Sequence, residues 1–249
     1  MKINKIIRLF FSAAIAISSC LDISASAETE TEEKLIALTF DDGSDGTNFS
    51  KILNILSNHQ IKATFFLTGS GTRAHPKIVK TAVQNGHDIG NHSFNHPDFT
   101  TLTPSQMLDQ LSQTETIIKN ATGKTSKPFF RAPYGATNQP VLSTVGNAGY
   151  PYTTHWTIDT FDWTGNSSST ITNRIVNNIK PGAIILMHTG DGASGTPNAL
   201  NTVIPQLKKM GYRFVTLSQL LKLAPLPSTG GSTYTVKAGD TLSQIALRY

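Results

Sequence analysis

The chain has 249 residues, of which 38% are hydrophobic and 15% charged, and its formal net charge is +5. This length allows one large α/β domain, or two ordinary domains, with a sizeable core. The charge is too weak to indicate nucleic acid as a partner. Cys20 is the only cysteine and lies in the N-terminal segment, so a disulfide scaffold and a thiol nucleophile are excluded for the remainder of the chain.

Residues 1–27 have the composition of a signal peptide. A short basic stretch precedes an apolar run over 9–17, and the small residues Ala-Ser-Ala end at Ala27. The apolar run is too short to span a membrane, so no transmembrane segment is expected. We therefore predict a secreted protein with cell-wall association as an option. A competing interpretation is lipoprotein processing at Cys20, which ends the sequence Ile-Ser-Ser-Cys.

The elements that follow alternate between strands and helices. Apolar positions spaced by three and four residues predict helices over 48–58 and 104–121, the second starting after Thr103-Pro104. Repeated alternation of this kind predicts a parallel sheet, either open or closed into a barrel. The predicted strands are short apolar runs, most of them bounded by Gly, Pro, Asn or Asp: 35–40, 63–67, 87–92, 128–133, 153–158, 182–188 and 212–217.

Polar residues cluster at the ends of five of these strands. Because the carboxyl ends of parallel strands meet at one face, where α/β folds bind their ligands, we expect these side chains to lie together. They are Asp41 and Asp42 after the first run, His92 after the third, Arg131 in the fourth, Asp159 and Asp162 after the fifth, and His188 at the end of the sixth.

The spacing of His92 and His96 indicates a metal site. Residues four apart share one face of a helical turn, so both imidazoles can reach one ion. Asp41 and Asp42 offer a third ligand, and adjacent residues after a strand point differently, so one can bind metal while the other serves as a base. A His-His-Asp set suits zinc, and also cobalt, nickel, manganese or iron.

Five ordered motifs carry a resemblance to a known family. "TFDDG", "NHSFNH", "RAPYG", "DTFDW" and "LMH" resemble the polysaccharide deacetylases of carbohydrate esterase family 4, the NodB-homology domain, over roughly residues 33–223. The resemblance implies a distorted (β/α) barrel with about seven parallel strands, a divalent metal, and hydrolysis of N-acetyl groups on a sugar polymer. Zinc is the metal we expect.

The resemblance also implies roles for individual residues in the first three motifs. Asp42, His92 and His96 correspond to the metal ligands, and Asp41 corresponds to the catalytic base. Arg131 corresponds to the arginine that holds this base. The backbone N–H of Tyr134, in "RAPYG", corresponds to the donor that stabilises the oxyanion.

The last two motifs supply the acid and the pocket. Asp162 corresponds to the aspartate that orients the catalytic histidine, and His188 to the general acid itself. Trp163 and Leu186 correspond to the residues that wall the acetyl pocket. An aspartate often follows the last histidine in this family, whereas this chain has Thr189; we expect little effect on the chemistry but a different groove shape.

Beyond residue 223 the composition changes. Residues 224–233 are a Pro/Gly/Ser/Thr linker, and 234–249 resemble the opening of a LysM module, which binds glycans containing N-acetylglucosamine. The leading hypothesis is a monomeric, secreted N-deacetylase of peptidoglycan or chitin oligomers. The alternatives are an O-acetyl esterase acting on acetylated xylan and a non-catalytic protein that binds wall glycan. A serine hydrolase is disfavoured because no Gly-x-Ser-x-Gly motif occurs.

Overall fold

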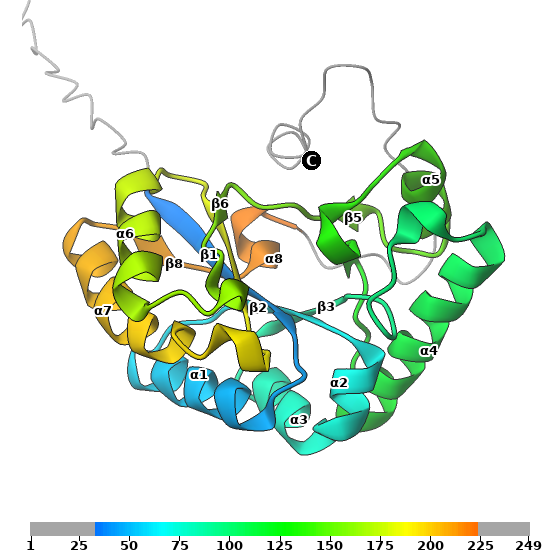
Figure 1. Ribbon diagram of the computed structural model, residues 1–249, viewed down its shortest axis with the longest axis horizontal. Coiled ribbons are helices and arrows are strands. Elements are labelled where there is room, and N and C mark those ends of the chain that lie inside the picture. The colour runs from blue at the N-terminus through cyan, green and yellow to red at the C-terminus, as the bar shows by residue number, and fades with distance from the viewer. Residues whose placement is uncertain (1–32, 224–249) are drawn as a thin grey trace, which may run out of the picture. The chain divides into compact units, whose positions relative to one another are not determined.

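A parallel sheet forms the centre of the protein in the computed structural model, which describes residues 33–223 (Figure 1). The strand order is β5-β4-β3-β2-β1-β7-β6, and β8 pairs with the start of β1. β5 and β6 are the two ends of this order. Within the described residues they do not pair with each other, so the barrel is open between them. The predicted distorted barrel of about seven parallel strands is confirmed. The strands are β1 (Leu35–Asp42), β2 (Thr64–Leu67), β3 (Asp88–Asn91), β4 (Phe129–Phe130), β5 (Tyr152–Thr153), β6 (Ile158–Asp159), β7 (Ile184–His188) and β8 (Arg213–Phe214).

Helices follow the strands, and the two predicted from periodicity are confirmed as α1 and α4. Thr103 begins α4 with a capping box, because its hydroxyl accepts from the Gln106 N–H and the Gln106 side chain accepts from the Thr103 N–H. The helices are α1 (Gly46–Asn58), α2 (Gly69–Ala74), α3 (Pro76–Gln84), α4 (Pro104–Thr122), α5 (Gln139–Asn147), α6 (Ser168–Asn178), α7 (Thr196–Lys209) and α8 (Leu217–Leu220). Short 3-10 turns are η1 (Phe99–Thr101), η2 (Pro133–Gly135), η3 (Asp162–Thr164) and η4 (Asp191–Ala193).

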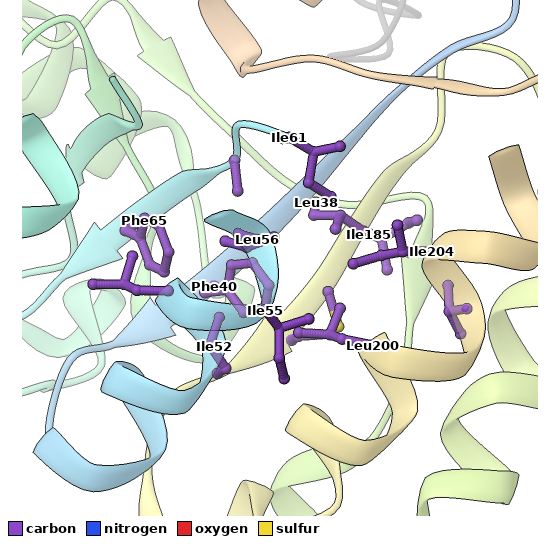
Figure 2. Close-up of a cluster of buried hydrophobic side chains, with 14 of the residues drawn as sticks. Leu38, Phe40, Ile52, Ile55, Leu56, Ile61, Phe65, Ile185, Leu200 and Ile204 are labelled. Carbon is purple, nitrogen blue, oxygen red and sulfur yellow. The ribbon is translucent and has the colours of Figure 1, made fainter. Parts of the chain in front are cut away.

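The alternation of side chains along β1 separates the core from the site. The side chains of β1 that face the helices are buried in the main hydrophobic cluster, between the sheet and helices α1 and α7 (Figure 2). On the opposite face, Ala37 packs against α8, and Thr39 and Asp41 contact the buried side chain of Arg131. The members of this cluster that Figure 2 labels are Leu38 and Phe40 of β1, Ile52, Ile55 and Leu56 of α1, Ile61, Phe65 of β2, Ile185 of β7, and Leu200 and Ile204 of α7.

The predicted strand over 153–158 is wrong, because the structure divides it into β5 and β6. The two strands pair with different neighbours, β4 and β7. Between them the carbonyls of Thr154 and His155 accept hydrogen bonds from the Arg131 guanidinium instead of joining a strand ladder. The opening in the barrel therefore coincides with the anchoring of Arg131.

Within residues 33–223, no helix combines the length and the apolar character needed to cross a bilayer. The predicted signal peptide (1–27), linker (224–233) and LysM-like segment (234–249) lie outside the described residues.

Candidate active site

Asp41 and His188 lie side by side at the carboxyl ends of β1 and β7. They are register partners in this parallel pair, just as Thr39 is the register partner of Leu186 two residues earlier. Because side chains alternate along a strand, all four occupy the inner face of the sheet. Parallel pairing thus brings together two residues that are 147 positions apart in the sequence.

Arg131 holds Asp41 from a fully buried position after β4. Its Nη1 donates to Asp41 Oδ1 at 2.8 Å and to Thr39 Oγ1 at 2.9 Å. Its guanidinium also stacks on the Phe66 ring, 4.1 Å from the centroid. Burial lowers the pKa of Arg131, but the charge of Asp41 opposes this, and an arginine stays protonated at any ordinary pH. Asp41 Oδ1 is therefore bound to a cation, whereas Oδ2 accepts no hydrogen bond within residues 33–223 and lies 3.6 Å from His92 Nε2.

Three side chains form a group suited to a metal ion. The candidate ligand atoms of Asp42, His92 and His96 all lie within 4.8 Å of one another. His92 Nδ1 donates to the carbonyl of Arg131 at 2.8 Å, so in the neutral ring Nε2 is the nitrogen that can coordinate a metal. Burial, followed by the charge of His92, lowers the pKa of His96 and so favours the neutral ring that a metal requires.

The expected helical turn at His92 and His96 is wrong: residues 92–98 form an irregular loop. Ser93 and His96 have φ of 68° and 62°, which a helix does not allow, and Pro97 disfavours helical geometry at His96. The side chain of Asn91 fixes the loop by accepting from the Ser93 N–H at 2.9 Å. The two imidazoles still meet, with ring centroids 4.9 Å apart.

Asp162 orients His188 from a fully buried position in η3. It accepts from His188 Nδ1 and from the His188 N–H, both at 2.8 Å, and also from Thr196 Oγ1 and the Trp163 N–H. Burial opposes a charge on His188. The hydrogen bond to Asp162, and the charges of Asp41, Asp162 and Asp42, outweigh it and raise the pKa of His188 to about 9. The ring is therefore protonated at neutral pH, with Nε2 available to donate.

The remaining predicted residues lie on both sides of this centre. Tyr134 is 71% exposed, with φ of 59°, and its ring packs edge-on against His96 at 4.6 Å. Its backbone N–H has no protein acceptor among residues 33–223. Trp163, in η3, is 53% exposed, and Leu186 is buried on the inner face of β7. An exposed aromatic ring therefore flanks the site from η2 and another from η3.

The sequence did not predict the hydrogen-bonding roles of three threonines that hold the site together. Thr39 binds Arg131, Thr196 binds Asp162, and Thr189 binds the turn at Asp41–Gly43. Only Thr39 had a local signal, because it lies two residues before Asp41 on the same face of a predicted strand. The side chain of Thr189 is fully buried, and the different groove shape expected at this position stays a prediction.

These contacts define a hydrolytic centre of a recognisable kind. A carboxylate held by an arginine, a histidine held by a second carboxylate, and an Asp-His-His group share the carboxyl end of one parallel sheet. Such a set can bind a metal, accept a proton from water and donate one to a leaving group.

Comparisons with known proteins agree with this centre. The family model described as polysaccharide deacetylase matches residues 28–153, and the model of the LysM domain matches residues 234–249. The chain is 40% identical over 189 residues to a peptidoglycan-N-acetylglucosamine deacetylase of Bacillus cereus, covering 75% of this chain and 68% of that protein. It is 36% identical to a peptidoglycan-N-acetylmuramic acid deacetylase of Bacillus subtilis, covering 80% and 76%. The chain therefore belongs to the polysaccharide deacetylase family.

Solved structures share the same fold. A crystal structure of a peptidoglycan N-acetylglucosamine deacetylase has a TM-score of 0.74 at 38% identity, covering 78% of this chain and 90% of that one. A carbohydrate esterase family 4 (CE4) pseudoenzyme from Bacillus anthracis has a TM-score of 0.70 at 33% identity, covering 76% and 66%. Because this family includes a pseudoenzyme, activity has to be argued from the residues of the site.

Proposed function

We propose that this protein is a secreted, metal-dependent hydrolase that removes N-acetyl groups from cell-wall glycan containing N-acetylglucosamine and releases acetate. One observation carries the proposal. The Asp-His-His group lies beside a carboxylate held by Arg131 and a histidine held by Asp162, so a metal site, a base and an acid share one sheet end. The named activities of the curated relatives support the amide bond as the target.

The residues fit a divalent metal. Asp42, His92 and His96 provide one oxygen and two nitrogen ligands, a set that suits zinc, with cobalt, nickel and manganese as alternatives. Three protein ligands are typical of catalytic rather than structural zinc. When bound, such an ion polarises the acetyl carbonyl and lowers the pKa of water toward about 7.

Different residues of the chain accept and donate the protons in this reaction. The free oxygen of Asp41 accepts a proton from the attacking water, while Arg131 keeps the carboxylate in place. The Tyr134 N–H donates to the oxygen that becomes negative in the tetrahedral state, a contribution of about 3 kcal/mol in comparable sites. His188, protonated and fixed by Asp162, donates its Nε2 proton to the departing amine. The products are acetate and a free amino sugar.

Two side chains form the walls of the pocket in which we place the acetyl group. Leu186 lies on the same inner face of β7 as His188 and presents an apolar surface suited to a methyl group. Trp163 follows Asp162 directly, so its exposed ring borders the site on the side of the acid. We infer that these two side chains wall the acetyl pocket and that Tyr134 borders it on the metal side.

The glycan and the location follow from the flanking segments and the relatives. We infer a signal peptide over 1–27, a catalytic domain over 33–223, a linker over 224–233 and an incomplete LysM-like segment over 234–249, whose resemblance points to wall glycan as the partner. The protein then acts outside the cell, on peptidoglycan or chitin-type oligomers, as a monomer.

Acetate release from three substrates tests this function. Chitooligosaccharides, peptidoglycan and acetylated xylan are incubated in parallel with the zinc-loaded protein. The proposal expects acetate from at least one substrate that carries N-acetylglucosamine. Acetate from xylan alone would make the protein an O-acetyl esterase. No acetate from any substrate, with metal bound, would favour a non-catalytic glycan-binding protein.

A further inference from the structure

Thr189 is the first residue after β7 and follows the candidate acid His188 directly. It makes three hydrogen bonds to one short segment: its N–H and its hydroxyl each donate to the carbonyl of Asp41 at 3.0 Å, and its hydroxyl accepts from the Gly43 N–H at 2.7 Å. One hydroxyl can make both of its bonds at once. Its oxygen accepts from the Gly43 N–H, which can only donate, and its own proton is donated to the Asp41 carbonyl.

The segment that Thr189 holds has an unusual backbone. Asp42 and Gly43 have φ of 84° and 76°, and a non-glycine residue rarely adopts the first of these. The carbonyl of Asp42 is held from the other side by the N–H and hydroxyl of Thr68, at 3.0 and 2.9 Å. The left-handed turn at Asp42 is thus fixed at its centre by Thr68 and at its two ends by Thr189.

This turn decides where two candidate functional carboxylates point. Asp41 reaches Arg131, while Asp42 joins His92 and His96. Any relaxation of the turn would move these carboxylates relative to each other. Because Thr189 is fully buried, loss of its hydroxyl would also leave the Gly43 N–H without a partner, at a site that water does not reach.

We propose that Thr189 is a positioning residue whose hydroxyl fixes the Asp41–Gly43 turn, and thereby the separation of the catalytic base from the metal ligand. The inference rests on the proposed function, because it takes Asp41 as the base and Asp42 as a ligand. The residue that directly follows the acid at the end of β7 then sets the geometry of the base on β1.

Three variants test the proposal. Thr189→Val keeps the shape but removes both hydroxyl bonds, and Thr189→Ser keeps the hydroxyl. Thr64→Val is the matched control: Thr64 is also a fully buried threonine whose hydroxyl accepts one backbone N–H, from Leu217 at 3.0 Å. It starts β2 beside Thr39, and no hydrogen bond of its side chain reaches the Asp41–Gly43 turn within residues 33–223. Should Thr189→Val not fold, Thr189→Ala takes its place.

The first readouts are affinity for Zn²⁺ and Co²⁺, the visible spectrum of the Co²⁺ form, and kcat for acetate release. Supporting contacts around metal ligands are typically worth about 10–100-fold. We expect at least a tenfold loss of affinity or kcat and an altered Co²⁺ spectrum in Thr189→Val. Thr189→Ser should lie within about threefold of the unsubstituted protein, and Thr64→Val should lose thermal stability only. Equal effects of the two valine variants, or no rescue by serine, would overturn the proposal.

Exchange of the Gly43 amide proton, measured by NMR without metal, separates this inference from the proposed function. We expect at least tenfold faster exchange in Thr189→Val than in the unsubstituted protein, and no change in Thr64→Val. If the unsubstituted protein releases no acetate and binds no metal, the proposed function fails, yet this readout still decides whether Thr189 holds the turn. Unchanged exchange in Thr189→Val would contradict that role.

Discussion

Asp41 and His188 are register partners on neighbouring parallel strands, so the candidate base and the candidate acid are placed by backbone pairing. Each is held by a buried group of opposite charge: Arg131 binds Asp41, and Asp162 binds His188, both at 2.8 Å. In the proposed function, these two pairs hold a proton acceptor and a proton donor on neighbouring strands. Removing one charge at a time separates these roles experimentally.

Asp41→Asn should retain metal and lose turnover. Asparagine can still accept the hydrogen bond from Arg131 Nη1, so the fold and the ligand group should persist, but an amide cannot take up a proton. We expect kcat to fall by about 10²–10⁴, the range of general-base catalysis, with stoichiometric zinc retained. Asp45→Asn is the control, because this N-cap position tolerates asparagine. A near-normal rate in Asp41→Asn would remove Asp41 as the base.

Asp162→Asn should move the alkaline limb of the pH–rate profile. In the proposed function His188 donates a proton. Against the effect of burial, the hydrogen bond to Asp162 together with the nearby carboxylate charges raises its pKa to about 9, so activity should fall as the pH rises through that region. Asparagine removes the charge that favours protonation, so the limb should move to lower pH and kcat should fall. Asp159→Asn, which keeps its bond to the Phe161 N–H, should leave the limb in place. An unmoved limb in Asp162→Asn would contradict the assignment of His188 as the acid.

Trp163→Ala should weaken substrate binding more than the chemical step. The exposed ring is lost, while the backbone N–H that binds Asp162 remains. We expect KM to rise about tenfold, equivalent to about 1.4 kcal/mol, with kcat within about threefold. Leu108→Ala removes a comparably exposed apolar side chain from α4 and should change neither constant. A selective loss of kcat would place Trp163 in the reaction itself.

His87 should make stability fall in mild acid. Its Nδ1 accepts from the Ala63 N–H, and burial, with the charge of Lys62, lowers its pKa from 6.5 to about 4. The unfolded chain therefore binds more protons between those values, and the free energy of unfolding decreases as the pH drops from 6.5 to 4, by at most about 3 kcal/mol. In His87→Asn this part of the decrease should vanish in denaturant titrations across that range. An identical pH dependence in both proteins would refute the assignment.

The sequence predicted the parts of this molecule that depend on local pattern. The alternation along 35–40 predicted β1, and the polar residues at strand ends predicted which edge of the sheet carries the site. The His92–His96 pair was predicted to meet, but in a helical turn. In the structure the two side chains come together in a loop that the Asn91 side chain holds and that contains Pro97. The spacing of the two histidines alone does not reveal this loop.

Contacts between distant residues could be predicted only where the family resemblance supplied them, as for Arg131 with Asp41 and Asp162 with His188. Thr196 binds Asp162 across 34 positions and Thr189 binds Asp41 across 148, and neither threonine stands in a pattern that differs from an ordinary loop. The break in the predicted strand over 153–158 also depends on a distant contact. Carbonyls within this segment accept hydrogen bonds from Arg131, which follows another strand. Periodicity reports which face of an element is buried, but it does not report which buried polar groups will meet.

The most direct test of the central claim is acetate release from N-acetylglucosamine oligomers before chelation, after chelation and after addition of Zn²⁺, with Asp42→Ala measured alongside. Asp42, His92 and His96 form the ligand group, so chelation should abolish release and zinc should restore it. Asp42→Ala should neither retain stoichiometric zinc nor regain activity. Undiminished acetate release after complete metal removal, or stoichiometric zinc retained by Asp42→Ala, would contradict the account.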